Sequence, residues 1–394
     1  MLRSKIFNKK GIKNMAKTLK AEHKKARIIR YSILLFVLLL STVMGLLHQF
    51  GTSFKAAPID AFCPFGGLES LYIFITAGGF LKRIALSSFI LLIATIVLAF
   101  VFRRTFCGNI CPLGTLQEFF EKLRGKFFRK RFVIPEKADK YLRYLKYLIL
   151  VLVLEETFRL GYLVIRPYDP WAAYHHIASA DLFIEFPVGF AVLLIALAGS
   201  FLYDRFFCKY MCPMGAFLGI VGKAGYFRIK RIEATCINCE LCTKVCPVNI
   251  KVHEVREVVD AECLNCNECV NKCPVENTLV IASPSGRKKV KAAWFTVITF
   301  LVFFGIIGLT TATGDFSWKM ASLGTSENLE KFDTDSIRGK YTYSEIIAAT
   351  GLPKEVFMER FGLTEDKLEL QLKESGIEAE EVREFIKELQ EKAK

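Results

Sequence analysis

The sequence predicts a mostly helical protein that crosses a membrane several times, with a small cysteine-rich α+β insertion and a small all-helical C-terminal domain. Two observations lead to this prediction. Of the 394 residues, 52% are hydrophobic, which is too apolar for an ordinary soluble protein, and 24% are charged, which excludes a chain that lies in lipid throughout. In addition, eight of the thirteen cysteines fall within the stretch 236–273 at regular spacing.

Five apolar stretches are predicted to span the membrane, because about 20 mostly apolar residues cross roughly 30 Å of hydrocarbon. The stretch 144–165 contains Glu155, Glu156 and Arg159, but it is still long enough to span the membrane. The apolar run 71–80 is too short to cross and is expected to be re-entrant or interfacial. The predicted spans are residues 28–48, 84–102, 144–165, 182–202 and 292–312.

The basic residues predict the orientation, because loops that hold Lys and Arg stay in the cytoplasm. Residues 1–27 contain ten Lys or Arg and one Glu, so this end is expected inside. Five spans then place residues 103–143 and 204–291 on the same side and the tail from about residue 313 outside, where 18 Asp or Glu outnumber 12 Lys or Arg. Inner loops and an anionic lipid surface account for the net charge of +15, so no nucleic acid partner is expected.

These boundaries divide the chain into five predicted domains. The tail has apolar residues at spacings of three and four and Thr-x-x-Glu starts, so it is expected to form short amphipathic helices that dock a partner subunit. The predicted domains are a basic cytoplasmic N-terminus (1–27), a membrane domain with four spans (28–225), a cytoplasmic cysteine-rich domain (226–291), a fifth span (292–312) and an extracytoplasmic helical domain (313–394).

The eight clustered cysteines form two runs of Cys-x2-Cys-x2-Cys-x3-Cys-Pro. This is the spacing of a bacterial two-cluster ferredoxin, in which three cysteines of one run and the last cysteine of the other run hold each [4Fe-4S] cluster. Disulfides do not suit the reducing side of a membrane, and a zinc site needs no interleaved Cys-Pro endings. The predicted ligands are Cys236, Cys239, Cys242 and Cys273 for one cluster, and Cys263, Cys266, Cys269 and Cys246 for the other.

A second cysteine pattern, Arg-x-Phe-Cys-x3-Cys-Pro-x-Gly, occurs twice, at residues 104–114 and 205–215. Both copies follow an outside-to-inside span, so their thiols are expected in one layer at the cytoplasmic membrane face. They would form a further metal or iron-sulfur site, exchange electrons with the ferredoxin clusters, or only pack helix ends as small apolar side chains. The cysteines of this candidate site are Cys107, Cys111, Cys208 and Cys212.

A truncated third copy, Phe-Cys-Pro-Phe-Gly, contains Cys63. The predicted topology puts Cys63 on the outer side, away from the other four thiols. Either its loop dips into the membrane, so that Cys63 joins the metal site, or this cysteine has a separate role. Both interpretations stay open.

Two Cys-x3-Cys-Pro motifs at membrane-helix ends, followed by a double ferredoxin motif, resemble the NapH and NosR type of membrane iron-sulfur proteins over roughly residues 28–300. The resemblance implies a multi-pass protein of the prokaryotic cytoplasmic membrane. It implies electron transfer between the quinone pool, or cytoplasmic donors such as a ferredoxin or flavoprotein, and an extracytoplasmic reductase. It also implies that the eight ferredoxin cysteines hold two [4Fe-4S] clusters and that the four Cys-x3-Cys-Pro cysteines lie at the membrane boundary.

The histidines and one charged pair offer weaker candidates. His48 and either His175 or His176 are expected near the outer face at the same depth, where they would be interfacial histidines of an aromatic belt, a quinone site or axial ligands of a haem. The aromatic belt is the preferred interpretation, and haem is the least favoured. Glu155 and Arg159 stand four apart and are expected to pair on their helix, with a proton path as the alternative.

Three functional hypotheses follow. The first is an electron-transfer component of an oxidoreductase complex, such as a quinol dehydrogenase. The second is a maturation or redox-sensing factor, similar to the CcoG type, that uses the same clusters to reduce a metal or a thiol. The third is a passive membrane anchor for a ferredoxin. No catalytic residue is predicted, because the cysteine-rich stretch offers no nucleophile or general base.

Overall fold

The structure is a computed structural model, and the chain forms two compact units, residues 1–319 and 320–394, which are described separately. Several predicted segments lie partly outside the described residues. These gaps include the start of the N-terminus, the first residues of the span 84–102, the end of the run 71–80, residues 161–163 and most of residues 320–340. The described residues are 9–50, 56–57, 62–77, 86–128, 132, 134–160, 164–179, 181–319, 332, 334–337, 339, 341–372, 375 and 377–392.

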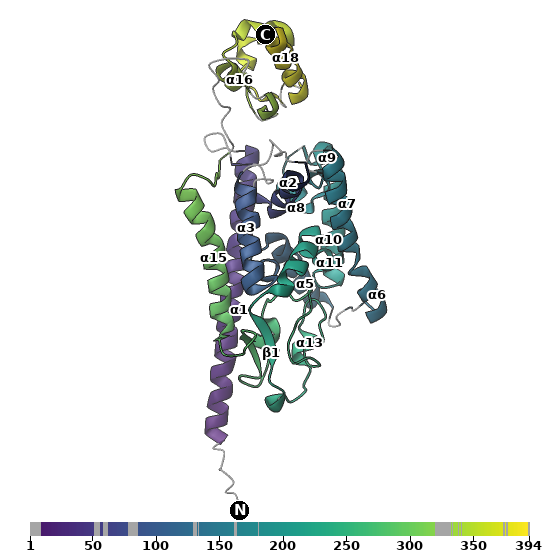
Figure 1. Ribbon diagram of the computed structural model, residues 1–394, viewed down its shortest axis with the longest axis vertical. Coiled ribbons are helices and arrows are strands. Elements are labelled where there is room, and N and C mark those ends of the chain that lie inside the picture. The colour runs from purple at the N-terminus through teal and green to yellow at the C-terminus, as the bar shows by residue number, and fades with distance from the viewer. Residues whose placement is uncertain are drawn as a thin grey trace, which may run out of the picture. The chain divides into compact units, whose positions relative to one another are not determined.

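Helices make up most of the first unit (Figure 1), as the sequence predicts. The helices α1 (Lys9–Phe50) and α15 (Ala292–Ala312) pack against each other. Among the described residues, these two are long and apolar enough to cross a membrane. Three helices at the other predicted spans are shorter, so the count of five spans stays a prediction. They are α3 (Leu86–Phe102), α7 (Leu145–Leu160) and α10 (Pro187–Leu202).

Two helix boundaries differ from the predicted spans. The helix α1 begins within the basic N-terminal stretch, because the Lys, Ala and Leu residues there are good helix formers. The predicted span 182–202 is not one helix: a short helix α9 (Asp181–Glu185) ends before Pro187, and α10 begins there. Proline lacks the backbone N–H that would continue α9, but it suits the first position of a new helix.

A short helix lies at the predicted re-entrant segment. It is α2 (Pro64–Ala77), and it packs along α3. The close approach depends on Gly67, since a Cβ at this position would lie 2.5 Å from the carbonyl oxygen of Ser88. The remaining short helices of the unit are α4 (Thr105–Asn109), α5 (Pro112–Phe127), α6 (Glu136–Leu142), α8 (Pro170–His175), α11 (Phe206–Tyr210) and α12 (Pro213–Val221).

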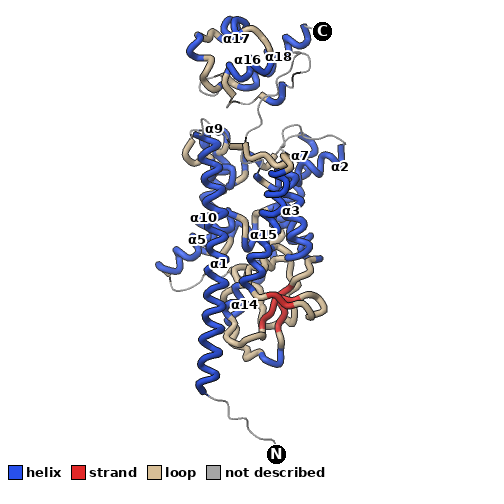
Figure 2. The backbone as a smooth tube through the Cα atoms, turned by 90° about the vertical axis from the view of Figure 1, so that its left-hand side faces the viewer, coloured by secondary structure: helices blue, strands red, loops and turns tan. Residues whose placement is uncertain are grey.

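The cysteine-rich insertion is a small α+β structure, as predicted, with an antiparallel sheet in the order β1-β2-β3. Ile229 of β1 pairs with Ile281 of β2, and both side chains are buried. Figure 2 shows the sheet in red beside α14. The elements of the insertion are β1 (Arg228–Arg231), α13 (Leu241–Lys244), α14 (Glu268–Lys272), β2 (Leu279–Ala282) and β3 (Lys289–Val290).

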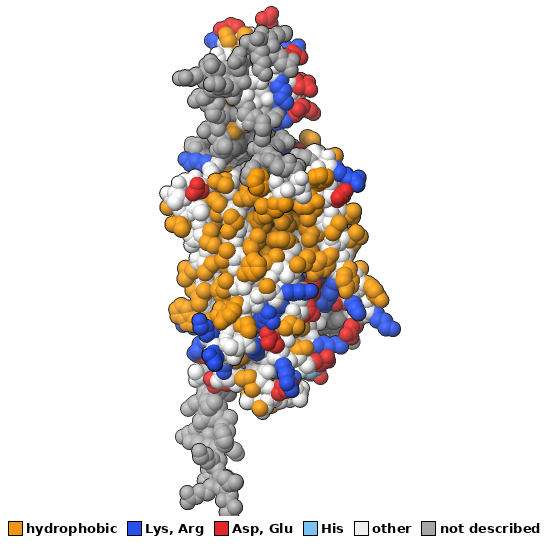
Figure 3. Space-filling model, viewed as in Figure 1, with side chains coloured by type: hydrophobic (Ala, Val, Ile, Leu, Met, Phe, Trp, Pro, Cys, Tyr) orange, Lys and Arg blue, Asp and Glu red, His pale blue; other side chains and the backbone are white. Residues whose placement is uncertain are grey.

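The surface of the first unit separates apolar from charged residues. In Figure 3, hydrophobic side chains cover the helical part, whereas Lys, Arg, Asp and Glu gather over the end that carries the insertion. Large hydrophobic side chains are exposed on several helices, which suits contact with lipid. Examples are Phe36 on α1, Phe100 on α3, Leu152 on α7, Ile195 on α10 and Leu301 on α15.

The second unit is helical, with a core of its own. It contains α16 (Tyr343–Thr350), α17 (Lys354–Phe361) and α18 (Ala379–Lys392). Thr342 and Glu345 form a capping box at the start of α16, which confirms the predicted Thr-x-x-Glu start. Tyr343, Phe357 and Ile386 are fully buried in its core.

We expect Gly67→Ala to destabilise the protein by about 1–3 kcal/mol, because the added methyl group forces α2 away from α3. The midpoint of thermal unfolding in detergent measures this. The matched control is Gly125→Ala on α5, where an added Cβ meets no atom within 4 Å. The control is expected to be neutral or to stabilise by up to about 1 kcal/mol. Equal midpoints for the two variants would contradict the close packing.

Candidate iron-sulfur centres

The two cysteine runs of the insertion turn in the same way. Positive φ occurs just before and just after the second cysteine of each run, at Asn238 and Glu240 in the first run and at Asn265 and Asn267 in the second. Asparagine tolerates this left-handed conformation better than most residues. The turns let closely spaced thiols approach one centre, so the same local geometry serves both runs.

Folding brings these eight cysteines into two groups whose members interact electrostatically. In each group three cysteines come from one run and the fourth from the other, which is the arrangement that the spacing predicts. The role of these side chains as ligands stays a prediction. The first cysteine group is Cys236, Cys239, Cys242 and Cys273, and the second cysteine group is Cys246, Cys263, Cys266 and Cys269.

The donor set of each group fits an iron-sulfur cubane, which takes four cysteine thiolates. In such a cluster each thiolate would hold a separate iron, so the four sulfurs would not converge on one metal ion. Within the described residues, no three His, Cys, Asp or Glu side chains lie close enough together to hold a single metal ion.

The two groups differ in exposure. All four cysteines of the second group are buried, whereas Cys236 and Cys239 of the first group are partly exposed. Burial raises the pKa of the Cys246 thiol to about 12 and that of the Cys266 thiol to about 11. The surroundings of the second group therefore disfavour negative charge more strongly than water does.

The four Cys-x3-Cys-Pro cysteines also come together. Cys107 and Cys208 lie on the short helices α4 and α11, and Cys111 and Cys212 directly precede α5 and α12, each with proline at the first helical position. Cys212 interacts with the other three, and Cys111 interacts with Cys107 and Cys208. We call these four side chains the four-thiol layer.

The repeated arginine and glycine of the two copies pack across this layer. A Cβ on Gly114 would lie 2.7 Å from Nη1 of Arg205, and a Cβ on Gly215 would lie 2.9 Å from Nη2 of Arg104. Nη1 of Arg205 also donates to the carbonyl oxygen of Cys107 at 2.5 Å. Each copy therefore supplies the arginine for which the glycine of the other copy leaves room, and this gives the repetition a structural reason.

Both of these arginines are fully buried, and their guanidinium groups are only partly satisfied. Among the described residues, Nε and Nη2 of Arg104 and Nε of Arg205 have no hydrogen-bond partner. Arg104 interacts electrostatically with Cys107, Cys208 and Cys212, and Arg205 interacts with Cys208. Buried N–H donors beside four sulfurs suit a bound group that is negatively charged and accepts hydrogen bonds.

A buried carboxylate joins the first helix to the repeated segments. Glu118 of α5 accepts hydrogen bonds from Nη2 of Arg30 and Nη2 of Arg205, both at 2.7 Å, and from the Tyr31 hydroxyl, also at 2.7 Å. Arg30 in turn donates from Nη2 to the carbonyl oxygen of Gly108 at 2.8 Å. One carboxylate thus lies between two buried guanidinium groups, and both of these donate to backbone carbonyls of α4, at Gly108 and Cys107.

The same end of α4 contacts the second cysteine group. A Cβ on Gly108 would lie 2.4 Å from the carbonyl oxygen of Leu264 and 3.2 Å from Cβ of Cys266. Nδ2 of Asn109 donates to the carbonyl oxygen of Asn265 at 3.3 Å. The end of α4 and the second ferredoxin loop therefore meet backbone to backbone, with no side chain between them at Gly108.

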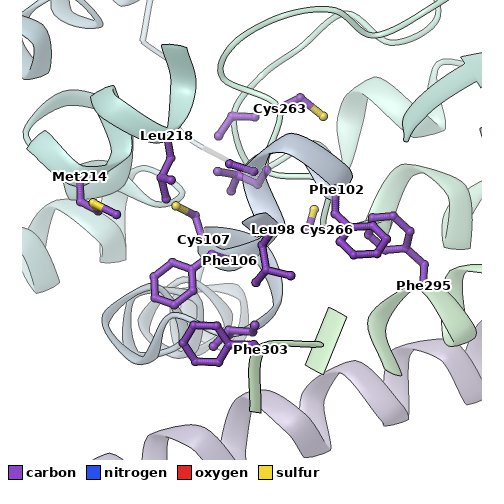
Figure 4. Packing of buried hydrophobic residues seen from close by; sticks show 14 of the residues in the cluster. Leu98, Phe102, Phe106, Cys107, Met214, Leu218, Cys263, Cys266, Phe295 and Phe303 are labelled. Carbon is purple, nitrogen blue, oxygen red and sulfur yellow. The ribbon is translucent and has the colours of Figure 1, made fainter. Parts of the chain in front are cut away.

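Aromatic packing surrounds this contact. Figure 4 shows Cys107, Cys263 and Cys266 in one packed region with Phe102. Phe102 also lies edge-to-face against Phe295 of α15, with ring centroids 5.3 Å apart. The ferredoxin loops and the ends of the apolar helices thus share one hydrophobic core.

An apolar cavity of about 300 Å³ opens beside the four-thiol layer. Its walls include Cys111 and Cys212 together with large aromatic side chains such as Trp171 and Phe303. Cys63 lines the same cavity. The cavity wall thus brings Cys63 near two of the other thiols, whereas both interpretations of its role and its place relative to the membrane stay predictions.

Sequence reasoning missed the charged residues around the thiols. Arg30 had a usable signal, because it lies inside the predicted span 28–48 and a charge in an apolar span is by default a functional candidate. The sequence contains no signal that singles out Glu118 or Glu262, since their partners are far away in the sequence. Glu262 lies between Arg104, at 3.2 Å, and Lys146.

The candidate histidines take part in hydrogen bonds near the end of α1. Nε2 of His175 lies 3.2 Å from the Ser41 hydroxyl, Nδ1 of His176 lies 2.8 Å from Nε2 of Gln49, and Nδ1 of His48 lies 2.8 Å from a backbone carbonyl. These contacts favour a structural role, in which the histidines hold helix ends together through hydrogen bonds. The predicted pair on α7 also forms, with Arg159 donating to Glu155 at 2.9 Å.

Comparisons with known proteins match these segments. A family described as "4Fe-4S binding domain" matches residues 84–132 and 185–232, which contain the two Cys-x3-Cys-Pro copies. A family described as "4Fe-4S dicluster domain" matches residues 228–282, which contain both ferredoxin runs. A relative from Escherichia coli K12, "Putative electron transport protein YccM", is 33% identical over 67% of this chain and 76% of its own length.

The chain belongs to the NapH and NosR type of iron-sulfur proteins. Within this family, it is 33% identical to the ferredoxin-type protein NapH of Haemophilus influenzae over 36% of this chain and 47% of that protein. It is 31% identical to the regulatory protein NosR of Pseudomonas aeruginosa over 37% of this chain and 20% of that protein. No solved structure matches the chain. The family supports an iron-sulfur electron-transfer role, with [4Fe-4S] clusters as the cofactor.

We expect Glu118→Ala to destabilise the protein by about 3–5 kcal/mol, because it leaves the charges of Arg30 and Arg205 buried without their shared carboxylate. Chemical unfolding in detergent measures this loss. The exposed Glu276→Ala serves as the control and is expected to stay within about 0.5 kcal/mol of the unsubstituted protein. If both variants unfold at the same denaturant concentration, the buried carboxylate does not have this role.

Proposed function

We propose that the protein is a membrane-bound electron-transfer protein in which two [4Fe-4S] clusters in the insertion exchange electrons with the four-thiol layer. The observation that carries this proposal is the direct contact of Gly108, one residue after Cys107, with Leu264 and Cys266. A contact without an intervening side chain brings the second cysteine group next to the layer, and short separations favour electron transfer.

The eight cysteines of the insertion are the proposed ligands of the two clusters, four for each. When bound, the clusters supply one-electron transfer over a range of potentials set by charge, hydrogen bonds and exposure. The protein chain would enclose the two clusters to different degrees. It leaves the first cysteine group partly open, which suits exchange with a soluble donor, and it shields the second group from water.

The four-thiol layer is the proposed third redox site, an iron-sulfur or other metal centre shared by the two Cys-x3-Cys-Pro copies. Support comes from the unpartnered nitrogens of Arg104 and Arg205, which suit a negatively charged group. Helix-end packing alone would leave these buried donors unexplained.

A membrane quinone is the proposed small-molecule partner. The cavity of about 300 Å³ is mostly apolar, and Cys111 and Cys212 form part of its wall. Such a cavity suits a flat apolar ring, because ligand pockets are concave and mainly apolar. The predicted topology places the insertion in the cytoplasm and the C-terminal unit outside, where it would dock a partner redox enzyme.

A second candidate function is the reduction of a soft metal or a thiol during maturation of another enzyme. The observation that favours it is Cys63, a third thiol on the wall of the same cavity. Thiolates select soft metals. The two functions differ in turnover: quinol oxidation at catalytic rates supports the first, whereas slow stoichiometric reduction of copper or of a thiol supports the second.

Anaerobic purification with iron and sulfide analysis tests the cluster assignment. We expect more than about eight irons per chain, since two cubanes account for about eight and the layer adds more. The double variant Cys107→Ser/Cys208→Ser should fall to about eight and keep the electron paramagnetic resonance signals of two [4Fe-4S] clusters. The exposed Glu276→Ala serves as a control that keeps the full iron content. Zinc in place of iron, or about eight irons before substitution, would contradict the corresponding part of the proposal.

A further inference from the structure

The second cysteine group lies in surroundings that oppose its reduction. A reduced cluster carries one more negative charge than an oxidised one, and burial makes this charge unfavourable. All four cysteines of the group are buried, whereas Cys236 and Cys239 of the first group are partly exposed. A relay that passes through this group therefore needs positive charge close to it.

One such charge is Arg103. Its side chain is 2% exposed and donates to backbone carbonyl oxygens, from Nε to Gly222 at 3.1 Å and from Nη2 to Asp260 at 2.8 Å. The carbonyl partners hold the guanidinium in place, and the carboxylates of Asp260 and Glu257 offset part of its charge. Asp260, whose carbonyl accepts one of these hydrogen bonds, lies three residues before Cys263, and Arg103 interacts electrostatically with that cysteine, so this charge acts on the second group.

The backbone of Arg103 is held in an unusual conformation, with a φ of 61°. This conformation is disfavoured for any residue with a Cβ and persists where the surrounding structure fixes it. Its neighbour Arg104 interacts with the four-thiol layer and also with Cys263. Both adjacent arginines therefore act on the second cysteine group, and Arg104 acts on the four-thiol layer as well.

Two more buried charges act on Cys266. Arg30 and Arg205 both interact with this cysteine electrostatically. They share the carboxylate of Glu118, so their combined charge is only partly neutralised at that point. The acidic residue that interacts with Cys266 itself is Glu268, which also pairs with Nη1 of Arg30 at 3.1 Å.

The first cysteine group has different charged neighbours. Cys236 interacts with Arg231 and with Glu233, and these two pair with each other at 3.2 Å. The cation there thus has its own carboxylate, and Glu233 is exposed to solvent, which screens both charges.

We propose that Arg103, together with Arg30 and Arg205, sets the reduction potential of the buried second cluster and keeps that cluster able to accept electrons from the first. This inference rests on the proposed function. The three arginines come from the membrane helices and the segments that follow them, not from the insertion, so the membrane domain controls the potential of a cluster that the insertion binds.

Potentiometric titration followed by electron paramagnetic resonance tests this proposal on the full chain, purified without oxygen in detergent. Arg103→Gln is expected to shift the potential of one cluster to a lower value and to leave the other unchanged. Arg103→Lys keeps the charge and is expected to restore most of the shift. The same shift in both variants would overturn the proposal, because it would reflect lost packing rather than lost charge.

A second variant is expected to shift the reduction potential in the opposite direction and to disturb folding less. Glu268→Gln removes a negative charge from a side chain that is 16% exposed and keeps its shape. It is expected to raise the potential of the cluster that Arg103→Gln lowers. No shift, or a shift of the other cluster, would overturn the proposal even if Arg103→Gln fails to fold.

A matched substitution checks that the response is specific to the second cluster. Arg360→Gln removes an exposed charge of the second unit, and both potentials are expected to stay unchanged. The same titrations also distinguish a failure of this inference from a failure of the proposed function. Absence of two [4Fe-4S] signals in the unsubstituted protein contradicts the function, whereas two normal signals that ignore Arg103 and Glu268 contradict only the role of the arginines.

Discussion

The carboxylate of Glu118 between the guanidinium groups of Arg30 and Arg205 is the interaction on which the arrangement of the thiols depends. Buried charges are stable only when they are paired and hydrogen-bonded. The first helix, α5 and the second repeated segment each supply one member of this set, so none of the three can move independently. The same groups fix the end of α4 at Cys107 and Gly108, and this end of the helix makes the contact with the ferredoxin insertion.

The two copies of the duplicated segment depend on each other structurally. One copy alone would present an arginine without a glycine to lie against and two thiols without a second pair. Because Arg104 reaches Gly215 and Arg205 reaches Gly114, the two copies form one structure with an approximate twofold relation. This explains why arginine and glycine recur together with the cysteines, and why proline follows each second cysteine at the start of a helix.

The sequence was most informative where a local pattern determines the structure. Cysteine spacing predicted the two groups of the insertion, and apolar runs predicted the positions of the long helices. It was less informative where distant residues meet. Pro187 breaks a run whose composition alone suggested one helix. Glu118 lies in an ordinary amphipathic helix, and only folding brings it to Arg30 and Arg205. Cys63 was assigned to the outer side by topology, yet it shares a cavity with Cys111 and Cys212.

The contact between Gly108 and Leu264 tests the account most directly. Gly108→Ala places a methyl group about 2.4 Å from a carbonyl oxygen, so the two loops must separate. Hydrogen–deuterium exchange of the anaerobic protein should then show faster exchange in residues 103–111 and 262–268 together, whereas Gly305→Ala, which meets no atom within 4 Å, should leave both unchanged. Unchanged exchange at 262–268 in Gly108→Ala would show that the insertion and the repeated segments are not joined there, and would contradict the account.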